Sequence, residues 1–547
     1  MRIKELRIKN YRNFDDVHVN FGGQILSFIV GENNLGKTNL LELLEAIFNG
    51  KQFEESDFKD IGKPIEVELT LIMEEFEVGV FDDLMSPNDN ENNSNDYEIN
   101  LFIEQKDPNE YVKVKHKESE KEIEYLKLKK HIIFLMYDSL RKPVDELSFD
   151  KQKSGKKFLY YISEKAFKES GNRTLLETSQ LQEIARKITS YLEHIKYFKD
   201  FNLRVDYTSD ELSQVLSLLS IVDKNSGLDI SNTGYGIQYT LMIYLHILNG
   251  ITRVLNPKNS RRKDDYIYHD NSSNKKYISM ILAIDEPEIH LHPYMQRSLI
   301  KSINKIINNE DKAFLNLIKE VFDIDGIKGQ VIVVTHSPNI LLNDYKQYIR
   351  VYREGNSIKF ISPRILDTDK EKHLNRHSHV IKEAMFSRLV VIVEGDTELG
   401  AIPIFFENLG IDLDEYGITV LKADGVESFG NIKEVLNNFG IHCITFADRD
   451  TNRQEDGVHD VVTSGKDFEE DVVNSLEDEI KRCICEKLKI NNTDNLAKEL
   501  RDKKNIITGK IIAECFGNKT ECIPEYIKKL AQKVKEKLGI GESIHEQ

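Results

Sequence analysis

Residues 31–38 read Gly31-Glu32-Asn33-Asn34-Leu35-Gly36-Lys37-Thr38, which is a complete G-x-x-x-x-G-K-T phosphate-binding loop. The apolar segment Ile25–Val30 precedes it, and Asn39–Phe48 follows with apolar residues at helical spacing. Strand, loop and helix therefore stand in the order that this motif requires. In such a loop backbone N–H groups surround a triphosphate, the lysine reaches the β and γ oxygens, and the threonine holds Mg²⁺. We expect ATP with Mg²⁺ to bind to Asn33, Asn34, Gly36, Lys37, Thr38 and Asn39.

The composition describes a globular protein of more than one domain. The chain has 547 residues, of which 40% are hydrophobic and 31% charged. No apolar run approaches the roughly 20 residues of a membrane span, and the charged start does not resemble a secretion signal. The odd count of five scattered cysteines argues against a disulfide framework, and Cys483 and Cys485 are too close for the usual zinc knuckle. We therefore expect a cytoplasmic protein without a membrane partner.

The net charge of −17 repels nucleic acid on average. Any binding to DNA must therefore come from a local basic surface or from a metal site. Lys151–Lys157 and Arg261–Lys263 are the candidate basic segments, although each alone is better interpreted as solvated loop charge.

The pattern along the chain predicts two α/β domains. Alternating strands near the start indicate an antiparallel β unit, and the segment 145–210 has a mostly polar helical pattern typical of an insertion or dimerisation lobe. A new apolar strand, Leu389–Val393, is followed by alternating helix and strand patterns, which predict a parallel sheet. We place one domain at residues 1–375 and a second, ending in helices, at 376–547.

Three further segments indicate an ATPase of the ABC type. The apolar strand 279–286 ends in Asp285, which would hold Mg²⁺ through water, and Glu286, which would polarise the attacking water. A second buried strand leads to His336, a candidate sensor of the γ-phosphate. Gly234 and Gly236 precede an apolar helix, at the position of the ABC signature.

In the ABC class the signature of one protomer completes the nucleotide site of another. The sequence therefore predicts a dimer of ATPase heads, although the segment departs from the usual Leu-Ser-Gly-Gly-Gln. His290 and His292, after the acidic strand, also permit a metal interpretation. Their resemblance to the dimer-facing loop of the ATPase heads of DNA-repair proteins explains them better.

The last third of the chain carries a second set of acids. Glu394 ends a buried strand and is followed by Glu398, while Asp448 and Asp450 end another strand about fifty residues later. This arrangement resembles the Toprim fold of topoisomerases, primases and some nucleases. Several carboxylates packed together need cations, and hard oxygen ligands suit Mg²⁺ or Mn²⁺. Two such ions can support phosphodiester cleavage.

Two downstream residues remain open. Glu469 lies in an acid cluster at a helix start, where it is either a metal ligand or a favourable partner of the helix dipole. Lys510 could stabilise charge on the scissile phosphate, although a solvated lysine is the simpler interpretation.

The order of these motifs resembles the OLD (overcoming lysogenisation defect) family of nucleases, and especially the nuclease subunits of Gabija-like anti-phage systems. The resemblance implies an ABC-type ATPase head, with a mixed β-sheet, helices and a helical insertion, followed by a Rossmann-like Toprim domain. It implies metal-dependent cleavage or nicking of double-stranded DNA, gated by the head, in a homo-oligomer with a possible helicase partner. By motif position the metal ligands are Glu394, Glu398, Asp448, Asp450 and Glu469, with Lys510 carried over weakly.

Two alternatives stay open. A topoisomerase or primase activity uses the same fold, but no strand-passage module with a nucleophilic tyrosine is evident. A regulatory ATPase scaffold with a non-cleaving Toprim domain is the alternative without nuclease activity.

Overall fold

The computed structural model describes residues 1–81, 84, 96–138, 147, 158–169, 178–207, 219–255, 264–423, 425, 428–449, 459–490 and 495–539. These form two compact units, Met1–Ser362 and Pro363–Gln547, which we call the head unit and the C-terminal unit. The division falls a little before residue 375, and the domain extents inferred from the sequence stay a prediction. Asp450 and the basic segments 151–157 and 261–263 lie outside the described residues.

The head unit begins with an antiparallel sheet. β1 (Arg2–Tyr11) pairs with β2 (Phe14–Asn20) and with β4 (Ile65–Glu74), as the alternating pattern predicted. In this register Leu6 lies opposite Val19 and Ile8 opposite Val17, so that alternate apolar residues enter the core. The sheet has the order β2-β1-β4-β5-β6-β7, completed by β5 (Asp96–Gln105), β6 (Lys113–His116) and β7 (Glu122–Ile123).

A second, mostly parallel sheet carries the nucleotide motifs. Its central strands are β8 (Ile133–Asp138), β12 (Lys275–Asp285), β13 (Gly326–Val334), β3 (Leu26–Gly31) and β14 (Tyr348–Glu354). Both faces of these strands are covered, which explains their almost continuous apolar sequences. β11 (Ile267–Asp270) and β15 (Ser357–Ile361) add antiparallel edges. The acidic strand and the strand before His336 are thus confirmed.

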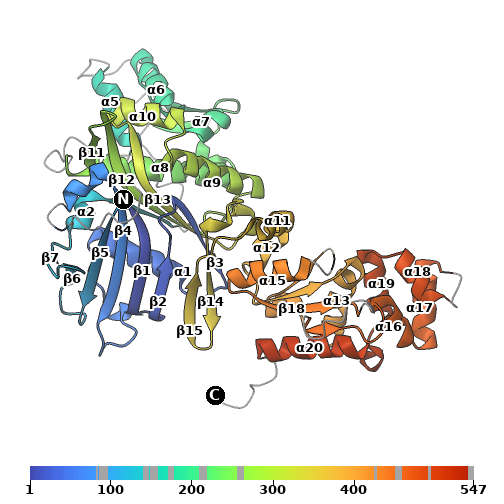
Figure 1. The fold of residues 1–547 in the computed structure, drawn as a ribbon. Helices are drawn as coiled ribbons and strands as arrows, with labels where there is room; N and C mark the ends of the chain where they lie inside the picture. Colours follow the sequence, from blue (N-terminus) through green and yellow to red (C-terminus); the bar gives the residue numbers. More distant parts are fainter. Residues whose placement is uncertain are drawn as a thin grey trace. The chain divides into compact units, whose positions relative to one another are not determined.

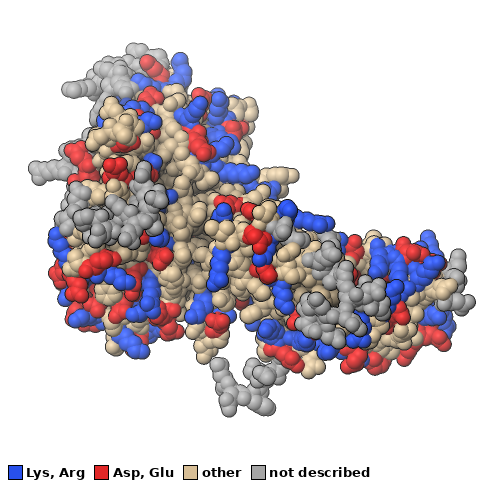
Figure 2. All heavy atoms as spheres, viewed as in Figure 1, with Lys and Arg blue, Asp and Glu red and all other residues tan. Residues whose placement is uncertain are grey.

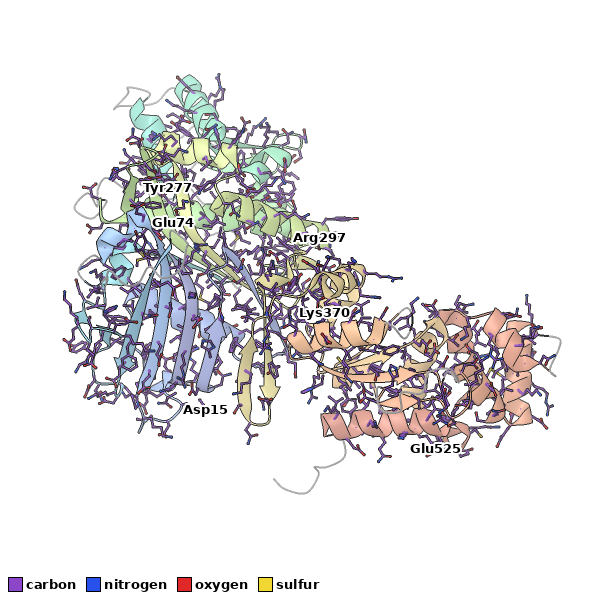
Figure 3. All side chains as sticks on the ribbon, in the orientation of Figure 1. Asp15, Glu74, Tyr277, Arg297, Lys370 and Glu525 are labelled. Carbon is purple, nitrogen blue, oxygen red and sulfur yellow. A yellow bond between two sulfur atoms is a disulfide. The ribbon has the colours of Figure 1, made fainter. Side chains whose placement is uncertain are left out.

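Helix α1 (Lys37–Asn49) and buried side chains join the two sheets of the head unit. Leu40 and Leu44 of α1 belong to the same hydrophobic core as Ile8 of the antiparallel sheet. At the edge of this core Lys328 Nζ lies 3.0 Å from Glu74 Oε2 and 5.3 Å from the ring centroid of Tyr277, near the labelled Glu74 and Tyr277 in Figure 3. The two sheets therefore form one packed body around α1.

The described part of segment 145–210 is mainly helical and packs on the head unit. Figure 1 shows α5 and α6 beside α10. Tyr161 of α5 stacks on Phe322 of α10 with ring centroids 5.6 Å apart. A two-stranded ribbon, β9 (Leu203–Tyr207) with β10 (Leu219–Asp223), follows α7. The remaining helices of the head unit are α2 (Lys127–His131), α5 (Phe158–Glu169), α6 (Thr178–Leu192), α7 (Lys196–Asp200), α8 (Tyr235–Leu255), α9 (Pro293–Ile307) and α10 (Lys312–Phe322).

The C-terminal unit is built on a parallel sheet in the order β17-β16-β18-β19. Its strands are β16 (Leu389–Val393), β17 (Ile418–Lys422), β18 (His442–Ala447) and β19 (Val461–Val462), which confirms the parallel sheet predicted from the sequence. The surrounding helices are α11 (Thr368–Arg376), α12 (Ser378–Ala384), α13 (Asp396–Asn408), α14 (Leu413–Tyr416), α15 (Phe429–Asn438), α16 (Phe468–Asn474), α17 (Asp478–Leu488), α18 (Leu496–Asp502), α19 (Ile506–Phe516) and α20 (Glu525–Leu538).

The surface of the antiparallel sheet mixes charges of both signs. Figure 2 shows Lys and Arg interspersed with Asp and Glu over these strands. Cross-strand pairs such as Arg7 with Asp16 (2.7 Å) and Lys9 with Glu66 (2.8 Å) account for part of this pattern. Within the described residues, no helix is long and apolar enough to cross a membrane.

Candidate nucleotide and carboxylate sites

A cavity of about 820 Å³ opens where the loop after β3 meets the ends of β12 and β13. The structure brings most of the predicted nucleotide residues to this one cavity. It is lined by Asn13, Asn33, Asn34, Gly36, Lys37, Thr38, Asn39, Glu286, Glu288, Ile289 and His336.

Lys37 is held inside the loop by the backbone of the loop itself. Its Nζ donates to the carbonyl oxygens of Gly31 (3.0 Å) and Glu32 (2.5 Å), and the residue is 4% exposed. Burial lowers the pKa of Lys37 to about 8, while Glu286 and Asp285 act in the opposite direction. Gly36 allows this compact loop, because its φ of 86° suits glycine and a Cβ there would lie 2.5 Å from Asn13. The loop therefore presents a fixed cation beside its amide groups.

Thr38 and Asp285 face each other across the base of the cavity. The Thr38 hydroxyl donates to Asp285 Oδ2 at 3.0 Å, while the buried Oδ1 accepts no hydrogen bond among the described residues. Burial raises the pKa of Asp285 to about 6, with Glu286 and Asp138 adding to the effect. A hydroxyl and an unsatisfied carboxylate oxygen are ligands that Mg²⁺ accepts, so these residues fit a magnesium–nucleotide complex.

Glu286 and His336 form a pair at the ends of adjacent strands. β12 ends at Asp285, and Glu286 follows with a left-handed φ of 46°, which turns its side chain toward His336. Oε1 of Glu286 lies 3.2 Å from His336 Nε2. Burial and the nearby Lys37 lower the pKa of His336, while Glu286 acts in the opposite direction. The pair can position a water next to the cavity.

Glu288 has a role that the sequence did not indicate. It is buried, and its Oε1 accepts from the backbone N–H of His336 at 2.6 Å. Burial raises the pKa of Glu288. It therefore fixes the backbone at His336. The motif itself gave no signal of this contact, because it depends on the bend after β12.

The two neighbouring histidines have structural partners. His290 stacks on Tyr239 with ring centroids 4.8 Å apart, and His292 Nδ1 accepts from the backbone N–H of Tyr294 at the start of α9. Gly234 and Gly236 lie at the start of α8, but they do not line the cavity described above. Their part in a nucleotide site shared between protomers stays a prediction.

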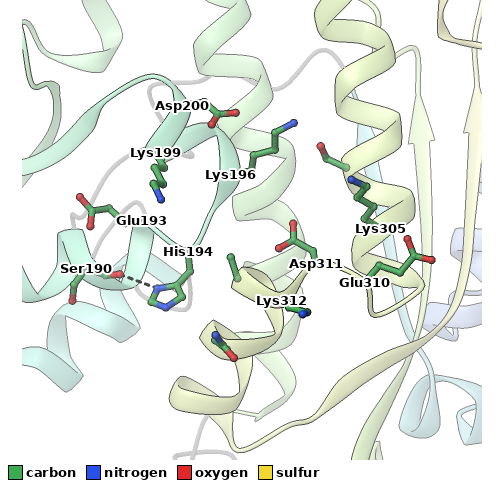
Figure 4. A pocket seen from close by; sticks show the side chains of 13 residues that line it. Ser190, Glu193, His194, Lys196, Lys199, Asp200, Lys305, Glu310, Asp311 and Lys312 are labelled. Carbon is green, nitrogen blue, oxygen red and sulfur yellow. Dashed lines mark hydrogen bonds between the residues drawn. The ribbon is translucent and has the colours of Figure 1, made fainter.

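A second cavity of about 810 Å³ lies between the helical insertion and α9–α10 (Figure 4). Acids and bases alternate along its wall, as the labelled Glu193, Lys196, Asp200, Lys305 and Asp311 show. Since neither sign of charge dominates, this cavity does not select a phosphate as the cavity around Lys37 does.

The C-terminal unit brings acids together at the carboxyl edge of its sheet. Glu394 follows β16 and Asp448 follows the adjacent parallel strand β18. The backbone N–H of Asp448 donates to Glu394 Oε2 at 3.1 Å. Asp448 Oδ1 in turn accepts from the N–H of Phe468, at the start of α16, at 2.9 Å. Two strand ends and a helix start therefore meet at Asp448.

Two further acids reach the same place from helices. Glu398 in the first turn of α13 is 2% exposed, and Glu469 in the first turn of α16 is fully buried. Burial, together with the neighbouring Glu398, Glu394 and Glu469, raises the pKa of Asp448 to about 8. Burial likewise raises the pKa of Glu398 to about 7, reinforced by Glu469 and Glu394. The acids thus lie close enough to disfavour one another's charged forms. We call these four side chains the carboxylate cluster.

The lysine that reaches the carboxylate cluster is Lys504. Its Nζ lies 3.0 Å from Glu469 Oε2, and its side chain is 44% exposed. Glu469, Glu398 and Asp448 raise its pKa against the effect of burial. Lys510, for which a solvated lysine was the simpler interpretation of the sequence, is exposed on α19. No local sequence motif marked Lys504 as a residue that contacts these acids, because its position depends on the packing of α19.

The carboxylate cluster fits a divalent cation chemically. Glu469 is 0% exposed; its Oε2 lies 3.0 Å from Lys504 Nζ, and its Oε1 accepts no hydrogen bond among the described residues. Buried, unsatisfied carboxylate oxygens are the ligands that Mg²⁺ and Mn²⁺ use. Within the described residues no group of three or more His, Cys, Asp or Glu side chains is arranged to hold a metal ion, and Asp450 is outside them. The four acids therefore lie close enough to affect one another's charge, but within the described residues they do not form a complete set of metal ligands.

A disulfide in the C-terminal unit differs from the expectation based on the cysteine count. Cys483 of α17 and Cys515 of α19 are joined, with Cα atoms 5.8 Å apart. The odd count hid this pair, because the two helices pack together although the cysteines are 32 residues apart. Cys443, Cys485 and Cys522 are free.

Fold and sites together define a P-loop ATPase head in one chain with a Toprim-type domain. A model of the AAA ATPase domain family (AAA_15) matches residues 1–197 and 145–341, and a model described as overcoming lysogenization defect protein-like, TOPRIM domain, matches 385–450. The chain belongs to this AAA ATPase domain family and carries an OLD-like Toprim domain.

Two curated relatives match part of the chain at modest identity. Endonuclease GajA of Bacillus cereus is 24% identical over 46% of this chain and 36% of its own length. The Old nuclease of Escherichia phage P2 is 24% identical over 55% of this chain and 47% of its own length. The chain is thus similar to less than half the length of either relative. The C-terminal region of the Xanthomonas campestris pv. campestris OLD protein covers 30% of the chain at 23% identity, with a TM-score of 0.25.

Proposed function

We propose that this chain is an ATP-binding endonuclease of the OLD type that nicks or cuts double-stranded DNA with the help of divalent ions held by the C-terminal unit. The carboxylate cluster is the observation that carries the proposal. Glu398 and Glu469 are buried and Asp448 is half-buried beside them, and the unfavourable charge among the three acids is relieved by protons or cations. The similarity to two relatives named as nucleases supports the same conclusion.

The residues of the C-terminal unit would hold Mg²⁺ or Mn²⁺ through Glu394, Glu398, Asp448 and Glu469, together with Asp450. When bound, such ions activate water and stabilise the leaving oxygen of a phosphodiester. The start of α16 holds Asp448 in place through the Phe468 N–H. Lys504 limits the negative charge around Glu469 and is exposed enough to meet a DNA phosphate.

In the head unit we assign triphosphate binding to Lys37 and the loop around it, and Mg²⁺ binding to Thr38 and Asp285. Glu286 would accept a proton from the attacking water, and His336 would hold it in position. We further propose that heads assemble in a homo-oligomer, in which Gly234 and Gly236 approach the nucleotide of a second copy. In this scheme the head gates cleavage in anti-phage defence, with a helicase as a possible partner.

One observation favours a second candidate, a regulatory ATPase scaffold whose Toprim domain does not cleave. Lys504 already pairs with Glu469, and the described acids do not form a closed metal shell. A lysine can replace a cation in a carboxylate cluster that has lost its metal. No observation favours the topoisomerase or primase alternative.

A nicking assay separates the two candidates. Supercoiled plasmid is incubated with the purified chain, with and without Mn²⁺ and ATP, in the wild type and in Glu394→Ala. We expect Mn²⁺-dependent nicking in the wild type and none in the variant, while both bind a fluorescent ATP analogue equally. Cleavage that persists in the double variant Glu394→Ala, Asp448→Ala would refute the assignment, and no cleavage by the wild type in any condition would favour the scaffold.

A further inference from the structure

The first turn of α19 exposes two apolar side chains beside the carboxylate cluster. We propose that Ile506 and Ile507 form a wedge that presses into the minor groove of duplex DNA, while the neighbouring lysines contact its phosphates. This inference rests on the endonuclease function proposed above and adds to it the way in which the substrate is held.

The two isoleucines leave a large part of their apolar surface exposed on the folded unit. Ile506 is 40% exposed and Ile507 is 68% exposed, whereas other isoleucines of this unit, such as Ile402 and Ile512, are buried. A single exposed isoleucine needs no explanation, but two in succession at the rim of a polar site indicate contact with a partner.

The position of this wedge relative to the acids is fixed by backbone contact. A Cβ at Gly400 of α13 would lie 2.1 Å from the carbonyl oxygen of Ile506, and one at Gly509 would lie 1.9 Å from that of Thr397. The first turns of α13 and α19 therefore touch directly, without side chains between them. Since Glu398 lies in that turn of α13, the isoleucines and the acids cannot shift independently.

The distance from wedge to acids suits a single bound duplex. Lys504 Nζ contacts Glu469, and Ile507 follows Lys504 by three residues, so the Cα atoms of Lys504 and Ile507 are at most about 11 Å apart. A phosphate held at the acids would therefore have the edge of a groove, about 6 Å wide on the minor side, within reach of the isoleucines.

The charge around the wedge complements DNA in an otherwise acidic chain. Figure 2 shows Lys and Arg gathered over α18 and α19. Asn505 caps α19 by accepting from the Thr508 N–H at 2.9 Å, which leaves the first turn well ordered. From residue 495 to 510 the chain carries five cations and two acids. Arg501 pairs with Asp467 and Glu470, and Lys504 pairs with Glu469, so the cations placed to meet phosphates are Lys498, Lys503 and Lys510.

This combination matches a known physical mode of DNA binding. Proteins that bend DNA insert apolar side chains between base steps from the minor groove and hold the strands with flanking cations. Unstacking of a base step near the acids would also expose the adjacent phosphodiester to them. A protein partner would use the apolar pair equally well, but it would not require the surrounding lysines.

The test compares Ile506→Ser/Ile507→Ser with Ile365→Ser in the full chain. Ile365 is 82% exposed in the same unit, and its neighbour Arg364 contacts Asn438 at the end of α15, at the amino edge of the sheet and away from the acids. The probe is a fluorescent 30-base-pair duplex carrying 2-aminopurine, titrated with protein in Ca²⁺ to slow cleavage. We expect the wild type to raise the 2-aminopurine signal, and the double variant to lose that rise and bind about tenfold more weakly.

Further outcomes separate the wedge from the nuclease assignment. Lys503→Gln and Lys510→Gln should each reduce the slope of log affinity against log salt concentration by about 1, because each removes one phosphate contact. The melting curve of every variant should match that of the wild type. If the wild type nicks plasmid but the double variant keeps its affinity and its 2-aminopurine signal, the wedge is wrong and the nuclease assignment stands. An equal loss of affinity for single-stranded DNA would also overturn the wedge, in favour of simple stacking. If the wild type neither binds nor cleaves duplex DNA, both proposals fail.

Discussion

The head unit and the C-terminal unit both place carboxylates at the ends of buried parallel strands, but they supply the balancing cation differently. In the head unit Lys37 comes from the loop itself, is 4% exposed and lies among Asp285, Glu286 and Glu288. In the C-terminal unit Lys504 comes from a separate helix region and is 44% exposed. A buried lysine such as Lys37 favours the binding of an anion in the head unit. A cluster of acids with a lysine at its edge, such as Lys504, favours the binding of a metal cation.

The largest expected effect comes from a substitution that impairs DNA nicking by the C-terminal unit and leaves ATP binding by the head unit unchanged. Asp448→Asn should reduce plasmid nicking by roughly 1,000-fold, equivalent to about 4 kcal/mol of transition-state stabilisation, because it removes a carboxylate that we propose as a metal ligand. Asp396→Asn is the matched control, since Asp396 pairs with Lys422 at 2.9 Å instead of with the cluster. Equal nicking rates in the two variants would contradict the distinction. ATP binding, measured by fluorescence titration, should stay unchanged in both.

The second largest effect concerns the rate of ATP hydrolysis by the head unit. Glu286→Gln should slow ATP hydrolysis by about 100-fold, because an amide cannot accept the proton of the attacking water. ATP affinity should persist, since the loop around Lys37 is intact. Phosphate release is the measurement, with Glu310→Gln, an exposed acid, as the control. Normal turnover would remove Glu286 from this role.

Removal of the internal cation should weaken nucleotide binding. Lys37→Ala should raise the Kd for ATP by roughly 30-fold, about 2 kcal/mol, which is the contribution of a charge-assisted hydrogen bond. Lys51→Ala removes an exposed lysine that pairs with Glu45 and should have no effect. A nucleotide titration that gave the same Kd for both variants would show that Lys37 does not bind the triphosphate of ATP.

The smallest effect is a pH-dependent stabilisation by metal. Asp448 and Glu398 have pKa values raised to about 8 and about 7 in the folded chain, so folding favours their protonated forms. Their contribution to stability is greatest below the ordinary pKa values near 4 and is lost as the pH rises to about 8. Mn²⁺ should reverse this loss. At 100-fold excess over Kd it should add about 2.7 kcal/mol, roughly 5 °C or more in Tm, at pH 8 and less at pH 5.5.

Calorimetry in EDTA and in Mn²⁺ measures this shift. Asp448→Asn should abolish it, and Lys37→Ala should leave it intact. A metal effect that was larger at pH 5.5 than at pH 8 would contradict the proposed role of the carboxylate cluster.

Local motifs were predictable from the sequence because their residues are contiguous. The loop from Gly31 to Thr38, the acidic strand ending at Asp285 and the strands before Glu394 and Asp448 each carry an apolar run followed by polar residues. The fold class followed from their order, since parallel strands bring such ends to one edge.

What the sequence could not give depends on packing between distant segments. Lys504, which lies just before α19, pairs with Glu469 of α16, and close contact of α13 with α19 at Gly400 and Gly509 positions the start of α19. Lys510, which the sequence carried over only weakly as a functional residue, is exposed. The support of His336 by Glu288 likewise depends on a turn whose geometry includes the left-handed Glu286.

The bond between Cys483 and Cys515 closes a covalent ring in the chain, and Lys504, Ile506 and Ile507 all belong to it. A protease that cuts once inside this ring leaves both fragments attached, so gels run without reductant would show a protein of full size. Adding reductant would separate them. Limited digestion analysed in both ways thus reports directly on whether the ring is closed in a given preparation.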